Sequence, residues 1–206
     1  DLIPVAAGMA GGSTDAAAVL VGVNRMFDLG FTKKELMERG VKLGADVPYC
    51  IMRGTALSEG IGEILTELPA PPQCHLVIAK PQISVSTKAV YGKLRVNELA
   101  PEEHPDIDGM MAAIKNGDLD GVIERLGNVL ETVTVPDHPE IARIKEMMME
   151  NGACGSLMSG SGPTVFGIYK DKELAEKACQ ALREADGGRL TRQVYLTEFY
   201  NRKKAR

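Results

Sequence analysis

Apolar residues recur along the chain with two periods, one typical of helices and the other typical of strands. In the first predicted helix, for example, Ala17, Leu20 and Val21 share one face at helical spacing. The predicted helices are residues 13–27, 33–43, 107–116, 118–131, 139–150 and 171–186, with a further helix beginning near residue 85. The predicted strands are residues 55–58, 64–66, 75–79, 164–169 and 193–199.

The proline-rich stretch Pro69–Pro72 is the clearest break in this pattern and is typical of a linker. It predicts two domains, covering residues 1–70 and 71–206. Towards the C-terminus, the order of strand, loop, strand, helix and strand suits a ferredoxin-like domain. We therefore expect an α+β fold.

Composition narrows the classes of function that these elements can serve. The chain has 206 residues and a formal net charge of −4, and no basic run interleaves aromatic residues, which argues against a nucleic-acid-binding protein. No apolar run is long enough to cross a membrane. The four cysteines are far apart and form no Cys-x-x-Cys pair, which favours a reduced, cytoplasmic protein without a zinc site.

The segment Pro4–Thr14 carries the strongest chemical signal. It is rich in glycine and alanine and leads directly into a predicted helix. Such a loop points free N–H groups and the positive end of the helix dipole at one spot, which suits a phosphate group. A tight turn that lets the helix pack closely is an equally good interpretation of these residues alone. The glycine spacing matches neither the Walker A loop nor the dinucleotide-binding fingerprint.

Two further segments are candidates for a site. Asp46 lies near Val47, whose position before a proline disfavours helical backbone angles, so we expect Asp46 at a junction between a helix and a strand. On the residues alone, an aspartate that bonds its own backbone in a turn is the simpler interpretation. The serine loop, Met158–Thr164, is expected between two strands, and its alternative interpretation is a flexible hairpin.

These three segments together resemble the GHMP kinases, the superfamily of galactokinase, homoserine, mevalonate and phosphomevalonate kinases. Pro4–Thr14 is similar to the second motif of that superfamily, with small replacements that keep bulk or hydroxyl. Gly44–Pro48 is similar to the segment that carries the catalytic aspartate, and the serine loop is similar to the third motif. The form of the motifs resembles one branch, the diphosphocytidyl-methylerythritol kinases.

The resemblance implies a role for each segment in phosphoryl transfer from ATP. Asp46 would be the catalytic base, Tyr91 would stack on a cytosine ring, and Thr55 would lie near the acceptor alcohol. The residues implied in binding ATP are Pro4, Val5, Ala6, Ala7, Gly8, Met9, Ala10, Gly11, Gly12, Ser13 and Thr14. The residues implied in binding the substrate are Thr55, Tyr91, Ser159, Gly160, Ser161 and Gly162. From the residues alone, Tyr91 could equally pack its ring into the core, and Thr55 belongs to an ordinary hairpin.

The resemblance also implies a fold and a set of cofactors. The fold is the two-domain GHMP kinase fold, with a ribosomal protein S5 domain 2-like N-terminal domain, truncated here, and a ferredoxin-like C-terminal domain. ATP is the phosphate donor and Mg²⁺ its companion ion. The hydroxyls of Ser13 and Thr14 would contact phosphate or Mg²⁺, and no residue is assigned as a dedicated metal ligand. The lysine of the first family motif has no counterpart in the sequence. We therefore expect this chain alone to bind nucleotide poorly and to turn over slowly or not at all.

The implied reaction is ATP-dependent phosphorylation of the 2-hydroxyl of diphosphocytidyl-methylerythritol, a small-molecule substrate in the methylerythritol phosphate pathway to isoprenoid precursors. Two alternatives remain open at this point. The first is another GHMP small-molecule kinase, of the homoserine or mevalonate type. The second is a non-catalytic nucleotide-binding module. The sequence also leaves both a monomer and a homodimer open.

Overall fold

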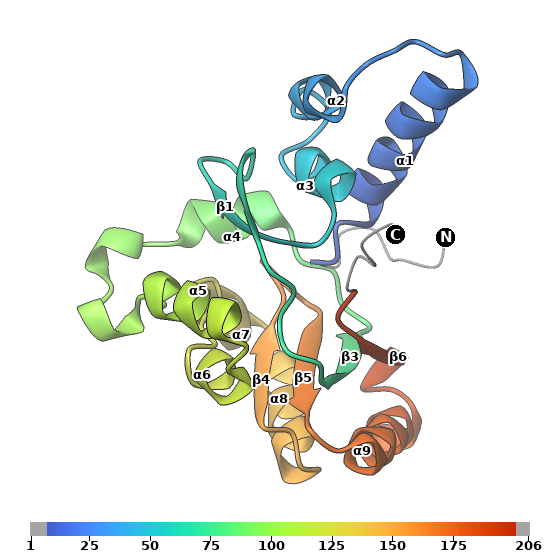
Figure 1. The fold of residues 1–206 in the computed structure, drawn as a ribbon. Coiled ribbons are helices and arrows are strands. Elements are labelled where there is room, and N and C mark those ends of the chain that lie inside the picture. Colours follow the sequence, from blue (N-terminus) through green and yellow to red (C-terminus); the bar gives the residue numbers. More distant parts are fainter. Residues whose placement is uncertain (1–7, 201–206) are drawn as a thin grey trace. The chain divides into compact units, whose positions relative to one another are not determined.

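The computed structural model describes residues 8–200, without the side chain of Arg192, and it divides into two compact units (Figure 1). Unit 1 contains residues 10–70 and Tyr200, and unit 2 contains residues 8–9 and 71–199. The chain therefore passes from unit 2 into unit 1 within the glycine-rich segment, and it returns to unit 2 at the proline-rich stretch. Across residues 8–200, no helix is both long enough and apolar enough to cross a membrane.

Unit 1 combines packed helices with an antiparallel hairpin. Its elements are α1 (Gly11–Met26), α2 (Lys33–Gly40), α3 (Val47–Met52), β1 (Thr55–Glu59) and β2 (Ile64–Leu68). Ala17 of α1, Leu36 of α2, and Val47 and Ile51 of α3 form one buried apolar cluster. This cluster holds the three helices together, as the apolar face predicted for α1 requires.

The helix α2 begins at residue 33, as the sequence predicted, and a capping box holds its first turn. The Thr32 hydroxyl accepts a hydrogen bond from the N–H of Glu35, and the Glu35 carboxylate accepts one from the N–H of Thr32. The hydrogen bonds that Thr32 donates from its N–H and hydroxyl favour the charged carboxylate and lower the pKa of Glu35. The capping box therefore satisfies backbone donors that the helix itself leaves unpaired.

The predicted junction between a helix and a strand at Asp46 is wrong. Asp46 lies directly before α3, and Pro48 occupies the first turn of that helix. A proline is tolerated there because the N–H that it lacks has no partner inside the helix at that position. Val47 is only 1% exposed, so burial of its side chain outweighs the backbone preference that a following proline imposes.

Unit 2 is built on a four-stranded antiparallel sheet with the strand order β4-β5-β3-β6. Its strands are β3 (His75–Pro81), β4 (Gly155–Met158), β5 (Val165–Tyr169) and β6 (Thr191–Glu198). Its helices are α4 (Thr87–Lys93), α5 (Ile107–Asn116), α6 (Leu119–Glu124), α7 (Glu131–Asp137), α8 (Pro139–Glu150) and α9 (Lys172–Glu184), with short 3-10 turns at Val96–Glu98, Pro101–Glu103 and Ala185–Gly187. In this order, the first strand of the unit lies between the third and the fourth, which is the ferredoxin-like arrangement expected from the sequence.

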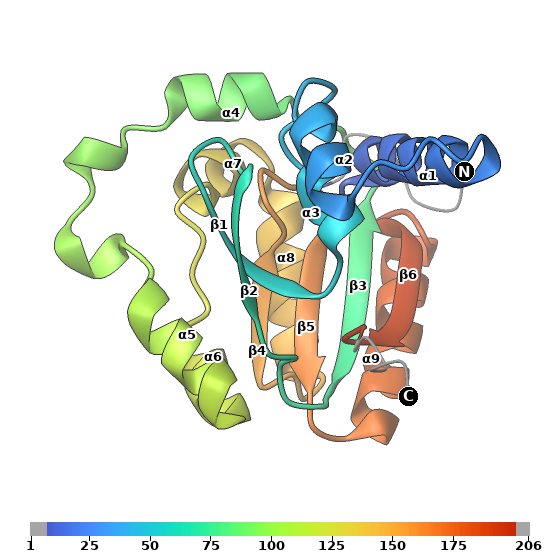
Figure 2. The same ribbon diagram turned by 45° about the horizontal axis from the view of Figure 1, so that its top comes forward.

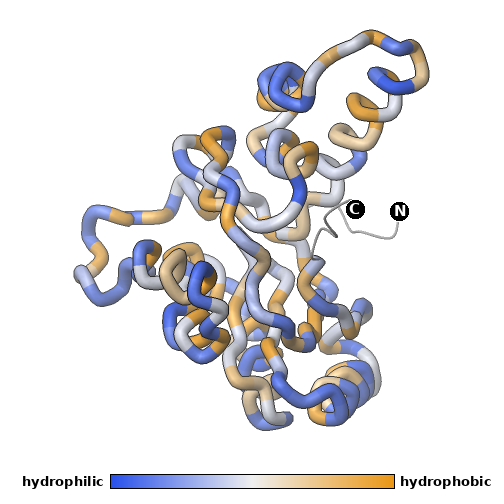
Figure 3. The backbone as a smooth tube through the Cα atoms, viewed as in Figure 1, coloured by the Kyte–Doolittle hydropathy of each residue, from blue (hydrophilic) through white to orange (hydrophobic). Residues whose placement is uncertain are grey.

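The sheet buries apolar residues on both faces. Val77 and Ala79 of β3 belong to the large core cluster that includes buried residues of α8 and α9, and both helices lie behind the sheet in Figure 2. Leu76, directly before Val77 in sequence, belongs to a smaller cluster against which Ile123 of α6 packs. Figure 3 shows α9 mainly in blue with separate orange segments, as expected for a helix with one buried stripe.

The predicted helix over residues 118–131 is wrong in its second half. The structure ends α6 at Glu124 and begins α7 at Glu131. Between them, the Asn128 side chain accepts a hydrogen bond from the N–H of Leu130 at 3.0 Å. Such a local bond offers the backbone an alternative to the helix. It explains why the helix does not continue through this segment although the apolar spacing does.

Candidate active site

The first turn of α1 is open towards a possible anion. Ala10 precedes the helix with a left-handed φ of 49°, no side chain caps the helix, and the first turn contains no acidic residue. Gly12 is exposed, and nothing lies within 4 Å of the position that a Cβ would take there. The first N–H groups of α1 and the positive end of its dipole therefore face space that a phosphate could occupy.

The two hydroxyls of this turn differ in their partners. Thr14 Oγ1 donates to the carbonyl oxygen of Ala10 at 2.9 Å and lies 3.6 Å from the sulfur of Cys50 in α3. Ser13 Oγ has no hydrogen-bond partner among residues 8–200, and it lies 3.9 Å from the position that a Cβ would take on Gly44. The open turn of α1 thus lies beside the segment that carries Asp46, within the same unit.

Asp46 combines an exposed side chain with a firmly held backbone. Its carboxylate caps no helix N–H and makes no hydrogen bond to any residue from 8 to 200, so it does not bond its own turn. The next two residues, Val47 and Pro48, are buried. One turn of α3 further on, the Tyr49 hydroxyl donates to the carbonyl oxygen of Gly54 at 2.7 Å, and burial raises the pKa of this phenol. The backbone around Asp46 is thus anchored, while its exposed carboxylate stays accessible to a ligand.

The serine loop of unit 2 is tied to several other segments and is not a free hairpin. Ser159 Oγ donates to the carbonyl oxygen of Gly8 at 2.6 Å, so the loop contacts the start of the glycine-rich segment. The Ser161 side chain is buried, and its hydroxyl lies 2.7 Å from that of Thr87 in α4. The carbonyl oxygen of Ser161 accepts a hydrogen bond from the buried Thr134 hydroxyl at 3.3 Å.

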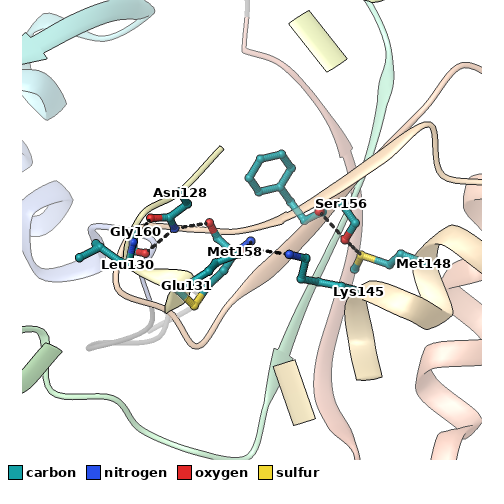
Figure 4. Close-up of polar contacts among 9 residues, drawn as sticks. Asn128, Leu130, Glu131, Lys145, Met148, Ser156, Met158 and Gly160 are labelled. Carbon is teal, nitrogen blue, oxygen red and sulfur yellow. Dashed lines mark hydrogen bonds and ion pairs between the residues drawn. The ribbon is translucent and has the colours of Figure 1, made fainter. Parts of the chain in front are cut away.

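Behind this loop lies a cluster of polar residues that we call the brace: Asn128, Glu131 and Lys145 (Figure 4). The Asn128 side-chain amide donates to the carbonyl oxygens of Met158 at 2.9 Å and of Gly160 at 2.8 Å. The Glu131 carboxylate accepts from the N–H of Met158 at 2.8 Å and forms an ion pair with Lys145 at 2.6 Å. Sequence reasoning missed these residues, although Asn128 followed three positions later by Glu131 is a spacing typical of a helix start.

The remaining candidates fall into different parts of the molecule. Pro4, Val5, Ala6 and Ala7 lie outside the described residues. Thr55 is the half-buried first residue of β1 in unit 1. Tyr91 lies on α4 in unit 2 and is 59% exposed, so its ring is not packed into the core. The structure therefore brings Gly8 to the serine loop in unit 2, and the first turn of α1 to the Asp46 segment in unit 1.

The described residues contain no grouping of three or more His, Cys, Asp or Glu side chains that could hold a metal ion. All four cysteines are free thiols.

Comparison with known protein families and curated proteins gives a consistent result. Residues 2–54 match the model of the GHMP kinases N terminal domain, and residues 110–187 match that of the GHMP kinases C terminal domain. A protein of Lachnospira eligens named 4-diphosphocytidyl-2-C-methyl-D-erythritol kinase is 57% identical over 96% of this chain and 67% of its own length. A protein of the same name from Lachnoclostridium phytofermentans is 53% identical over 98% of this chain and 67% of its own length. The chain thus spans about two thirds of the length of these relatives.

Solved structures show the same relationship at the level of the fold. A crystal structure of 4-(cytidine 5'-diphospho)-2C-methyl-D-erythritol kinase superposes with a TM-score of 0.77 at 29% identity, over 95% of this chain and 67% of that protein. Homoserine kinase from Cytophaga hutchinsonii superposes with a TM-score of 0.79 at 20% identity, over 97% of this chain and 67% of that protein, and shows the same fold. The expected α+β fold of a GHMP kinase is confirmed. The chain belongs to the GHMP kinase superfamily and, within it, to the family of the 4-diphosphocytidyl-2-C-methyl-D-erythritol kinases.

Proposed function

We propose that the whole protein transfers the γ-phosphoryl group of ATP to the 2-hydroxyl of 4-diphosphocytidyl-2-C-methyl-D-erythritol, a step of the methylerythritol phosphate pathway. The observation that carries the proposal is the position of the exposed Asp46 segment beside the open first turn of α1. The relatives of the same family provide the identity of the acceptor. Phosphoryl transfer needs mainly positioning and neutralisation of charge, and this arrangement offers both.

In the proposed mechanism, Asp46 accepts the proton of the acceptor hydroxyl. The oxygen of that hydroxyl then forms a bond to the γ-phosphorus, the bond from the γ-phosphorus to the bridging oxygen breaks, and ADP leaves. The N–H groups of Gly8–Ser13 hold the phosphate oxygens during this transfer, whereas the N–H of Thr14 donates to the carbonyl oxygen of Ala10 at 2.8 Å and leaves only its side chain for the ligand. Pro4–Ala7 complete the same segment. A positioned base of this kind contributes roughly 10²–10⁴-fold to a rate.

Mg²⁺ is part of the proposal because it would neutralise charge on the phosphates of ATP. The hydroxyls present fit this role, since Ser13 Oγ has no partner among residues 8–200 and Mg²⁺ prefers oxygen ligands. Thr14 Oγ1 already donates to Ala10, so only its lone pairs remain for a cation.

Several further residues are proposed to bind the acceptor. Tyr91 stacks on the cytosine ring, which its 59% exposure allows. Thr55, Ser159, Gly160, Ser161 and Gly162 lie near the acceptor alcohol and the phosphates. Residues 1–70 then form the remainder of the ATP-binding domain, and residues 71–206 form the C-terminal domain. We assign the protein to the cytoplasm, which its four free thiols support.

A direct test uses the full-length protein with ATP, Mg²⁺ and each candidate acceptor in turn. We expect mass spectrometry to show a phosphorylated product with the cytidyl alcohol and none with homoserine or mevalonate. Faster phosphorylation of homoserine or mevalonate would favour the other GHMP kinase types, whose fold this chain shares. Binding of ATP without phosphorylation of any acceptor would favour the non-catalytic module.

A further inference from the structure

We propose that Asn128 and Glu131 are positioning residues that set the conformation of the serine loop, with Lys145 holding Glu131 in place. The inference rests on the proposed function, because it concerns the loop assigned to the acceptor and the phosphates. The observation behind it is that the brace binds the loop through its backbone. A backbone contact fixes the directions of peptide groups whatever side chains the loop carries.

The orientation of the Asn128 amide is set by its hydrogen bonds. Its Oδ1 accepts from the N–H of Leu130 at 3.0 Å, so the NH₂ group must be the one that faces the loop. That group donates to the carbonyl oxygens of Met158 and Gly160, at 2.9 and 2.8 Å. One side chain therefore satisfies two loop carbonyls that are separated by a single residue.

Holding these carbonyls also fixes the donors that follow them. In a trans peptide, the C=O and the next N–H point in opposite directions. The N–H of Ser159, which follows the carbonyl of Met158, donates across the hairpin to Thr164 at 2.8 Å. By the same rule, the N–H of Ser161 points away from Asn128, so the brace determines which way the donors of the loop face.

Glu131 holds the loop at its first residue, Met158, which is also the last residue of β4. One carboxylate oxygen accepts from the N–H of Met158 at 2.8 Å, and the other pairs with Lys145 at 2.6 Å. The side chains of Glu131 and Lys145 are only 19% and 26% exposed, so this pair is shielded from water more than a surface ion pair is. The carboxylate is therefore restrained on both sides.

The effect of the brace extends to the glycine-rich segment. Ser159 lies between the two residues that Asn128 holds, and its hydroxyl donates to the carbonyl oxygen of Gly8 at 2.6 Å. Gly8 has a φ of 70°, and a Cβ there would lie 2.2 Å from the carbonyl oxygen of Ser159. A shift of the loop would therefore move or release Gly8, so the brace positions two glycine-rich segments of unit 2 together.

The first test compares Asn128→Asp with Asn151→Asp in the full-length protein. Asn128→Asp keeps the acceptor for Leu130 but replaces the NH₂ group by an oxygen that faces two carbonyl oxygens. Asn151 is a matched control, because its amide also donates to one backbone carbonyl, that of Met147 at 2.8 Å, at the end of α8. We expect Asn128→Asp to lower kcat about 100-fold, the size of effect that a small misplacement produces, with KM changing by less than about threefold. Asn151→Asp should leave both constants within about twofold of the wild type.

A second measurement does not depend on catalysis. Hydrogen exchange of peptides covering residues 155–166 should become at least about tenfold faster in Asn128→Asp and should not change in Asn151→Asp. This readout separates the inference from the proposed function. If the wild type phosphorylates no acceptor, the proposed function fails, whereas the exchange data still decide whether the brace holds the loop.

A third variant pair tests Glu131 in case Asn128→Asp does not fold. Glu131→Gln leaves the amine of Lys145 without its carboxylate partner, and the double variant with Lys145→Met removes that unpaired charge. We expect kcat of the double variant to be at least about threefold higher than kcat of Glu131→Gln. The reason is that the neutral pair keeps a hydrogen-bond acceptor for the N–H of Met158. The inference is overturned if Asn128→Asp leaves both loop exchange and kcat at wild-type values. It is also overturned if kcat falls as far in Asn151→Asp as in Asn128→Asp. The same holds if adding Lys145→Met to Glu131→Gln does not raise kcat.

Discussion

Asp46 in unit 1 and the serine loop in unit 2 both have roles in the proposed function, but the structure holds them in different ways. The Asp46 carboxylate is exposed and makes no hydrogen bond to residues 8–200. In the loop, by contrast, Ser161 is buried, and both serine hydroxyls contact other segments. The side chain that acts on a ligand is exposed and makes no hydrogen bond within the described residues. The backbone that shapes the loop is held by hydrogen bonds from buried or half-buried side chains. Substitutions at Asp46 should therefore change the rate alone, and substitutions around the loop should change stability as well.

The largest expected effect is on catalysis in Asp46→Asn. The amide keeps the shape of the side chain but cannot accept the proton of the acceptor hydroxyl, so kcat should fall by about 10²–10⁴-fold. Because Asp46 caps no helix, the free energy of unfolding should change by less than about 0.5 kcal/mol. Steady-state kinetics and urea unfolding measure the two quantities.

Asp28→Asn is a suitable control for that variant, since Asp28 is an exposed aspartate of the same unit in the turn after α1. It should leave kcat unchanged. A wild-type kcat in Asp46→Asn would remove Asp46 as the base. A large loss of stability would instead show that its carboxylate is not as free as the structure indicates.

The next effect is on stability, in Gly8→Ala compared with Gly117→Ala. Both glycines lie in unit 2 with positive φ, at 70° and 67°, but nothing lies within 4 Å of a Cβ on Gly117. Gly117→Ala should cost only the strain of the backbone, about 1 kcal/mol. Gly8→Ala adds a clash with the carbonyl of Ser159, so its cost should be about 2–4 kcal/mol. Urea unfolding should show this difference, and equal costs would mean that the contact between Gly8 and the loop does not form.

A smaller effect is expected for substrate binding in Tyr91→Leu. Stacking of an aromatic side chain on a base contributes about 1–3 kcal/mol, so KM for the cytidyl substrate should rise at least about fivefold. Because the ring is 59% exposed, stability should hardly change. Tyr195→Leu replaces a tyrosine of the same unit that is 41% exposed, and it should leave KM unchanged. Equal KM values in the two variants would exclude stacking by Tyr91.

Periodicity and turn chemistry predicted much of this fold because those signals are local. The start of α2 at residue 33 and the ferredoxin-like order of strands followed from short patterns and appear in the structure. The errors arose where a local preference competed with burial or with a side chain. At Val47, packing against α1 and α2 outweighed the backbone preference imposed by the following proline. At Asn128, a side-chain hydrogen bond interrupted a helix that the apolar spacing had predicted.

The candidate site was accessible from sequence only in part, for a related reason. Glycine and serine content marks a loop that comes close to a ligand, so the serine loop could be found from composition. The brace could not, because Asn128 lies 30 positions before Met158, and only the folded chain brings them together. Polar residues that support a site from behind look like solvated helix residues until their partners are known.

The smallest expected effect tests one of these supporting contacts, the hydrogen bond from Thr134 to the carbonyl oxygen of Ser161. Thr134 is 1% exposed and the bond is long, at 3.3 Å, so Thr134→Val should cost only about 1 kcal/mol in the free energy of unfolding. Thr132, on the same helix α7, is exposed and its hydroxyl donates to Val129, so Thr132→Val should stay within about 0.5 kcal/mol of the wild type. Because the brace still holds the loop in Thr134→Val, kcat should fall by less than about threefold, the equivalent of half a kcal/mol or so. A loss of kcat as large as that expected for Asn128→Asp would show that the loop depends on Ser161 more than on the brace.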